Sequence, residues 1–427
     1  MNAINMIPTD AYYKNLPQLS LNERDRRWST IRAWMETQGI DCLLSVGNDM
    51  TFGLGMGNFR YLANSAPRHG GFLIFPLKGE PCMFAEPYHM TRPIHPCVLA
   101  HDWVKDCYYN KGVNAVIDEM LNRVPNMKKV GFVCGANTVQ YQNMPFDIYD
   151  TLITRLKGIE IVDASKFIFD MRGVKSDEEV AFLTKAGQIH HEVLMAEIDA
   201  VREGATEADV FAAMGHAMIK NGAEPQGFNL MTSGPLYSPK LQYLLHGLDA
   251  DMCPTMRKLE RGDTVIGECH ISYGGYMTAS EFTLCVGQPP KEYERLFYVM
   301  VEAFNALTEK LVPGNQFGDV IDAARAVVRK HDVDILELGM HSHGLGSPEP
   351  PWGIYMHTDE ALAPAEKRVT QAQKDVVIQK NMVFGTNGDL FDSKWRPDLG
   401  IMFGDCVLVT DNGPKLLVNT PQKLIIK

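Results

Sequence analysis

Three features that mark other classes of protein are missing from this chain of 427 residues. No apolar run is long enough to cross a bilayer, and the N-terminus lacks a basic segment followed by an apolar one. Basic residues are not in excess either: the formal net charge is -11, whereas nucleic-acid binding needs a positive face to neutralise phosphates. We therefore expect a cytoplasmic protein without a membrane or nucleic-acid partner.

Cysteine is present but shows no pattern. The nine cysteines are an odd number and include no C-x-x-C pair, so they indicate neither a disulfide framework nor a zinc ribbon, and we expect buried reduced thiols. Low-complexity segments and tandem repeats are also absent. With 45% hydrophobic and 22% charged residues the composition is that of a globular protein, and the length predicts two domains rather than one core.

The first part of the chain alternates apolar runs with amphipathic segments. A helix is predicted over residues 24–38, ending at Gly39, because glycine commonly follows the last helical turn. Buried strands are predicted over 41–46, 71–76 and 129–133. This alternation is typical of a small α/β domain.

Helix caps indicate where the second domain begins. Ser176, with Glu179 three positions later, predicts a capping box at the start of a long amphipathic helix. Thr206 is the predicted cap of the helix that follows. We accordingly place the first domain at residues 1–165 and the second at residues 166–427.

The most informative stretch runs from Glu268 to Gly287 and reads ECHISYGGYMTASEFTLCVG. It resembles the central strand pair of the pita-bread superfamily, which contains methionine aminopeptidases, prolidases and creatinases. In the metallopeptidases this stretch has the form D-x(10)-D-x-T-R-T, and its two aspartates hold two metal ions. Matched without gaps through Gly275-Tyr276, those aspartates fall on Glu268 and Ala279. The resemblance implies an α/β N-terminal creatinase-like domain followed by a C-terminal α+β pita-bread domain.

Three further segments resemble the segments that carry the other metal ligands of the family. HSHGLG resembles G-H-G-x-G and the G-H-S-F-G of creatinase, NMVFGTNG resembles G-M-V-F-T-I-E-P, and GIMFGDCVLVTDNG resembles G-V-R-x-E-D-x-V-L-V-T-E-N-G. The five ligand positions then read Glu268, Ala279, His343, Asn387 and Gly404. Because hard divalent ions need several oxygen ligands, this set implies that the dinuclear metal site is lost and that no metal or other cofactor is required.

Glu281 lies two residues after Ala279, and residues two apart in a strand face the same side. The stretch GYMTASEFTL also resembles G-Y-Y-T-A-L-E-R-T-L of creatinase, the metal-free member of the superfamily, in which this glutamate contacts the guanidinium part of the substrate. The resemblance implies a catalytic role for Glu281, which its apolar neighbours favour over a solvated strand edge. Glu268 is either a second catalytic residue or a buried hydrogen-bonding group.

Hydrolysis requires a general base, and three histidines are candidates. His343 occupies the position of the family histidine. The resemblance also implies a histidine in the loop before the strand pair, where the nearest one is His246, either a shifted base or a surface residue. His270, two residues after Glu268 on the same strand face, could replace it.

The substrate side of the site departs from creatinase, which holds the substrate carboxylate with two arginines. One arginine of this chain, beside a histidine, falls near the first of them, and the second has no counterpart. Aromatic residues in predicted loops, either core filler or part of the site, favour an apolar ligand or a cation held over rings. The candidate substrate contacts are Arg68, His69, Tyr237, Trp352, Tyr355 and Asn387.

Three functions remain open. The favoured one is a metal-independent hydrolase of a small amide- or amidine-type C–N substrate, with a histidine transferring protons and Glu281 binding substrate or water. The second is a metal-free lyase that acts on a small metabolite. The third is a non-catalytic ligand- or peptide-binding protein, which is favoured if His246, His270 and His343 lie far from one pocket. Resemblance to creatinase also implies a homodimer in which the small domain of one chain closes over the site of the other.

Overall fold

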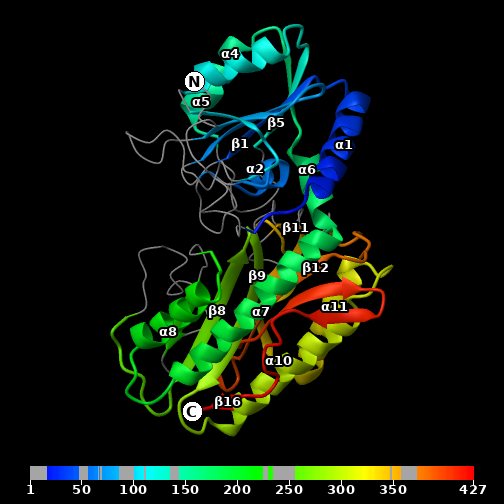
Figure 1. Ribbon diagram of the computed structural model, residues 1–427. Coiled ribbons are helices and arrows are strands. Elements are labelled where there is room, and N and C mark those ends of the chain that lie inside the picture. The colour runs from blue at the N-terminus through cyan, green and yellow to red at the C-terminus, as the bar shows by residue number, and fades with distance from the viewer. Residues whose placement is uncertain are drawn as a thin grey trace. The chain divides into compact units, whose positions relative to one another are not determined.

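The computed structural model describes residues 17–47, 56–65, 67, 70–85, 101–109, 112–134, 144–224, 229–233, 255–346, 349–356 and 373–427, with the backbone alone at 109, 229–233, 352–356 and 397–399. The chain divides into two compact units, Met1–Arg172 and Gly173–Lys427 (Figure 1). The division falls at the end of helix α6 (Ser165–Gly173), whereas the sequence predicts a domain boundary at residue 165.

The first unit contains a six-stranded sheet in the order β4-β3-β2-β1-β5-β6. Strand β2 pairs antiparallel with β1 and β3, and the other neighbours are parallel. The strands are β1 (Cys42–Gly47), β2 (Gly71–Pro76), β3 (Cys82–Ala85), β4 (Asp106–Tyr109), β5 (Lys129–Val133) and β6 (Glu160–Asp163). The helices besides α6 are α1 (Leu21–Gln38), α2 (Gly57–Ala63), α4 (Val113–Arg123) and α5 (Phe146–Arg155). This is the α/β arrangement that the alternating pattern predicts.

The predicted start of helix α1 is wrong by three residues. The helix begins at Leu21 rather than at residue 24, because the Ser20 hydroxyl accepts a hydrogen bond from the Glu23 backbone N–H at 3.2 Å and caps the helix earlier. Its end is as predicted, since Gly39 follows Gln38 in the left-handed region with φ 64°.

The second unit contains two sheets, of order β16-β9-β8-β7 and β11-β10-β12-β14-β15, with β13 paired to β12. The strands of the first are β7 (Asn229–Ser233), β8 (Thr264–Tyr273), β9 (Tyr276–Cys285) and β16 (Ile425–Ile426). Those of the second are β10 (Asp334–Ser342), β11 (Glu349–Met356), β12 (Val383–Asp392), β13 (Arg396–Met402), β14 (Cys406–Thr410) and β15 (Gly413–Leu416). The helices are α7 (Asp177–Ala200), α8 (Glu207–Lys220), α10 (Lys291–Glu309) and α11 (Phe317–His331).

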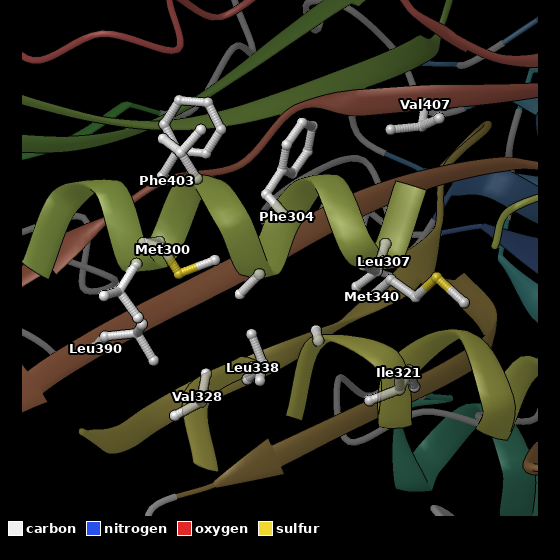
Figure 2. Close-up of a cluster of buried hydrophobic side chains, with 14 of the residues drawn as sticks. Met300, Phe304, Leu307, Ile321, Val328, Leu338, Met340, Leu390, Phe403 and Val407 are labelled. Atoms are coloured by element: carbon white, nitrogen blue, oxygen red, sulfur yellow. The ribbon is translucent and has the colours of Figure 1, made fainter. Parts of the chain in front are cut away.

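Helices cover the sheets of the second unit. Helices α10 and α11 bury a large apolar cluster against β10 and β12, in which Met300 of α10 lies beside Leu390 and Phe304 packs against Phe403 (Figure 2). Helix α7 packs against β8 and β9 (Figure 1). Both predicted caps are confirmed: Ser176 forms a capping box with Glu179, and Thr206 caps α8.

The two long strands β8 and β9 present one face to helix α7 and the other away from it. On the helix side, the buried His190 ring bonds Thr278 Oγ1 at 3.0 Å and Ser280 Oγ at 2.9 Å. Because side chains alternate along a strand, the opposite face carries positions 268, 270, 279 and 281. The helix therefore closes one face of the strand pair and leaves the other to the candidate site.

A buried carboxyl on α7 makes the stability of the fold depend on pH. Burial raises the pKa of Glu197 to about 8, and its Oε1 atom has no hydrogen-bond partner among the residues that the structure describes. A folded-state pKa above the unfolded value favours folding fully below pH 4.5, and this contribution is lost as the pH rises through about 8. We expect Glu197→Gln to match the wild type at pH 5 and to exceed it at pH 9, by a few kcal/mol at most.

Urea unfolding at both pH values measures this difference. Glu192→Gln, at an exposed position on the same helix, is the matched control and should change stability equally at pH 5 and pH 9. Equal effects of the Glu197 and Glu192 variants at the two pH values would contradict the prediction.

Candidate active site

Two pairs of strands bring polar faces together inside the second unit. In the β10–β12 pair, Glu337 lies opposite Asp389 and His341 lies opposite Gly385, so the side chains of these positions share one face. Glu281 of β9 reaches this face, because its Oε1 accepts a hydrogen bond from Asn387 Nδ2 at 2.8 Å. The face of β8 and β9 that points away from α7 therefore meets the polar face of β10 and β12.

Glu281 is held firmly in this interior. Its Oε2 accepts a hydrogen bond from the Gly388 backbone N–H at 2.8 Å, and its main chain pairs with Gly404. A Cβ added at Gly404 would lie 2.0 Å from the Thr386 carbonyl oxygen, so only glycine fits there. The fifth ligand position of the family thus has no room for a side chain in this backbone arrangement.

Four carboxyl groups form one end of the site: Glu281, Glu337 and Asp389 are buried, and Glu268 is partly buried. Burial raises the pKa of Glu281 well above its usual range, and the neighbouring Asp389, Glu268 and Glu337 raise it further. Burial and the charge of Glu337 raise the pKa of Glu268 to about 8. Because like charges this close together in the interior repel one another, the four groups do not all ionise at neutral pH.

Three buried histidines form the other end. The His343 ring centroid lies 4.7 Å from that of His341 and 6.1 Å from that of His270, and both pairs are stacked. Burial lowers the pKa of His341 to about 4 and that of His343 well below its usual value, so both rings are neutral at neutral pH. His270 Nε2 lies 3.5 Å from Glu268 Oε1.

Asn387 lies between the two ends. Its side chain bonds both Glu281 and His341. The positions two residues before and after Asn387 on β12 lie toward the same two ends. A Cβ added at Gly385 would lie 2.1 Å from His343 Nε2, at the histidine end, and Asp389 lies opposite Glu337, at the carboxyl end. The arrangement can therefore accept a proton at one end and hold a positively charged or hydrogen-bond-donating group at the other.

The structure brings together five of the predicted site residues: Glu268, His270, Glu281, His343 and Asn387. Trp352 and Tyr355 lie on β11 with backbones opposite His341 and Leu338, and their side chains lie outside the described part of the chain. The other predicted residues, Arg68, His69, Tyr237 and His246, also lie outside the described residues.

Sequence reasoning missed Glu337, His341 and Asp389. The signal was available for two of them, because Asp389 follows Asn387 by two residues and His341 precedes His343 by two, the same spacing that singles out Glu281 after Ala279. The carboxyl group next to one of the three candidate histidines is that of Glu268, whose Oε1 lies 3.5 Å from His270 Nε2.

Comparison with known proteins identifies the fold and then the family. The solved prolidase from Pyrococcus horikoshii OT3 superposes with a TM-score of 0.71 at 21% identity, covering 94% of this chain and 100% of that one. The model of metallopeptidase family M24 matches residues 181–411, and that of the creatinase/prolidase N-terminal domain matches residues 27–174. The chain therefore belongs to metallopeptidase family M24, and the predicted α/β domain followed by a pita-bread domain is confirmed.

Curated relatives carry different names. The Xaa-Pro dipeptidase of Pyrococcus horikoshii is 24% identical over 410 residues, 95% of this chain and 99% of the relative. The ectoine hydrolase of Halomonas elongata is 20% identical over 94% of this chain and 96% of its own length, and the creatinase of a Bacillus species is 24% identical over 68% of each. Within the described residues, no helix is long and apolar enough to cross a membrane.

The family name implies metal ions, and the residues at its ligand positions do not fit them. Asn387 directs its amide N–H groups, which cannot bind a cation, toward Glu281, and both oxygens of Glu281 are engaged by N–H donors. Positions 279 and 404 carry alanine and glycine. Across the described ranges, no three His, Cys, Asp or Glu side chains are placed to hold one metal ion.

Proposed function

We propose that this protein hydrolyses a C–N bond of a small amide- or amidine-type substrate, and that it does so without a divalent metal ion. The family and the named relatives support the broader statement that the protein is a hydrolase acting on C–N bonds. The observation that carries the finer proposal is the stacking of His341, His343 and His270 beside the Glu268 carboxyl group, 3.5 Å from His270, at the family's site. The proposal includes a homodimer in the cytoplasm.

In this proposal each end of the site has one task. The neutral ring of His343 takes a proton from the attacking water. Glu268 and His270, which lie 3.5 Å apart, share the proton that passes to the leaving nitrogen. Glu281, whose oxygens each keep a second lone pair, accepts hydrogen bonds from the amide or amidinium nitrogen of the substrate.

The geometry also bears on the alternative of a non-catalytic binding protein. That alternative is favoured if His246, His270 and His343 lie far from one pocket, and His246 lies outside the described residues. His270 and His343 are stacked with their centroids 6.1 Å apart, which supports the catalytic proposal instead.

The test is activity in the absence of metal. A panel of small amides and amidines is screened by thermal shift, and the release of ammonia or amine is then measured for those that bind. We expect purified protein to contain less than about 0.1 equivalent of transition metal and to keep its turnover within about twofold after dialysis against a chelator. About one or two equivalents of bound metal, with activity lost on chelation and restored by the metal, would sink the proposal.

A further inference from the structure

A buried ion pair lies next to the row of stacked histidines formed by His341, His343 and His270. Lys175 Nζ is 3.2 Å from Glu349 Oε1, and the two side chains are 0% and 2% exposed. Lys175 also donates hydrogen bonds to Ser342 Oγ at 2.8 Å and to the Gly173 carbonyl at 3.3 Å. A buried pair contributes to stability only if its geometry and additional hydrogen bonds offset the cost of desolvation, so a stabilising role alone is weak grounds for keeping one here.

The Lys175–Glu349 ion pair fixes strand β10 at a point where the backbone hydrogen bonds of the sheet are irregular. Ser342 stands between His341 and His343, and the β10–β11 pairing shifts register between His341 and Ser342, directly before Ser342 meets Glu349. At such an irregularity the backbone ladder no longer fixes the direction of the following residues. The hydrogen bond from Lys175 to Ser342 supplies a fixed point at this position.

The same pair packs against the residue on the other side of His343. A Cβ added at Gly344 would lie 2.3 Å from Glu349 Oε1 and 3.1 Å from Lys175 Cε. The Gly344 carbonyl accepts a hydrogen bond from Met277 N at 2.8 Å, and the Met277 backbone in turn bonds the His343 ring. The ion pair therefore contacts the chain immediately before and immediately after His343.

We infer that Lys175 and Glu349 are positioning residues, which fix the segment from Ser342 to Gly344 and thereby hold the His343 imidazole against the Met277 backbone. This inference rests on the proposed function, because it assumes that His343 transfers a proton. The inference rests on these contacts and not on the charge of Lys175, which adds to burial and the neighbouring histidines in lowering the pKa of His343 and so favours the neutral ring.

The experiment removes both charges together, since a single change would leave an unpaired buried charge and could unfold the protein. Lys175→Met/Glu349→Gln is expected to keep the thermal unfolding temperature near that of the wild type, to lower kcat about 10- to 100-fold and to leave KM nearly unchanged. The matched control is Arg257→Met/Asp263→Asn, which removes another ion pair of the same unit, 2.7 Å apart, and should leave kcat unchanged.

A double-mutant cycle separates positioning from general stability. If the pair acts through His343, its removal should lower kcat no further in a His343→Ala background. Equal losses in both backgrounds, or no loss in the wild-type background, would overturn the inference while leaving the proposed function intact. If His343→Ala itself keeps the wild-type rate, the proposed function fails instead, and the two failures are distinguishable.

Discussion

His343→Ala is expected to lower kcat by about two orders of magnitude or more while the protein stays folded. The ring is buried, stacked between His341 and His270, and bonded to the Met277 backbone, so its position is fixed before substrate binds. Burial keeps it neutral, which is the state that accepts a proton. Steady-state kinetics on the screened substrate, with circular dichroism of both proteins, measure the effect.

A glycine opposite the ring allows the same site to be tested without touching the histidine. A Cβ at Gly385 would lie 2.1 Å from His343 Nε2, and the stacked ring cannot move away freely, so Gly385→Ala should lower kcat to a similar extent. Gly215→Ala on α8, where a Cβ meets nothing within 4 Å, should keep full activity and gain about 0.5 to 1 kcal/mol of stability.

The matched histidine control is His191→Ala. His191 is partly buried on α7 and bonds the Val418 carbonyl at 2.9 Å, so its removal perturbs packing without reaching the histidine row. Wild-type rates for both His343→Ala and Gly385→Ala would mean that proton transfer takes place elsewhere in the molecule.

Helix ends could be predicted because the residues that determine them lie within a few positions of one another in the sequence. The capping box at Ser176 and Glu179 fixes the start of α7, and the glycine after Gln38 fixes the end of α1. The start of α1 was misplaced because Ser20, not the first charged residue of the amphipathic pattern, accepts the capping hydrogen bond. A cap is a single side-chain contact, and periodicity does not reveal it.

The site could be predicted only as far as the resemblance and the strand period reach. These lead to five residues that the structure brings together: Glu268, His270, Glu281, His343 and Asn387. Glu337 enters the site through its pairing with Asp389 across two strands, and Lys175 reaches Ser342 over 167 positions of sequence. Contacts of this kind depend on the register of the sheets and on packing, which no short motif encodes.

Two carboxyl groups of the site stand two residues after ligand positions of the family. Alanine and asparagine stand at 279 and 387, and carboxyl groups stand two residues further on at Glu281 and Asp389. On β9 this step leads away from Met277, which bonds His343, and on β12 it leads away from Gly385, which faces the same ring. Both steps therefore lead away from His343, each by about 7 Å along its strand.

Glu281→Gln is expected to lower kcat by about two orders of magnitude or more. The amide that replaces the carboxylate must turn an NH₂ group toward either Asn387 Nδ2 or the Gly388 N–H, both of which are donors. The substrate nitrogen then loses its hydrogen-bond acceptor. Because the donor–donor contact also costs stability, circular dichroism and the unfolding temperature are measured beside kcat to show that the variant is folded.

Two matched variants decide how this loss is interpreted. Asp405→Asn alters another buried carboxylate that accepts hydrogen bonds from two backbone N–H groups, those of Val418 and Thr420, so it should lower the unfolding temperature and leave kcat within about threefold. Glu268→Gln should lower turnover if Glu268 shares a proton with His270, and should lower only stability if its role is structural. If Glu281→Gln keeps the wild-type rate on the natural substrate while Asp405→Asn behaves as described, the carboxyl end of the site does not bind substrate.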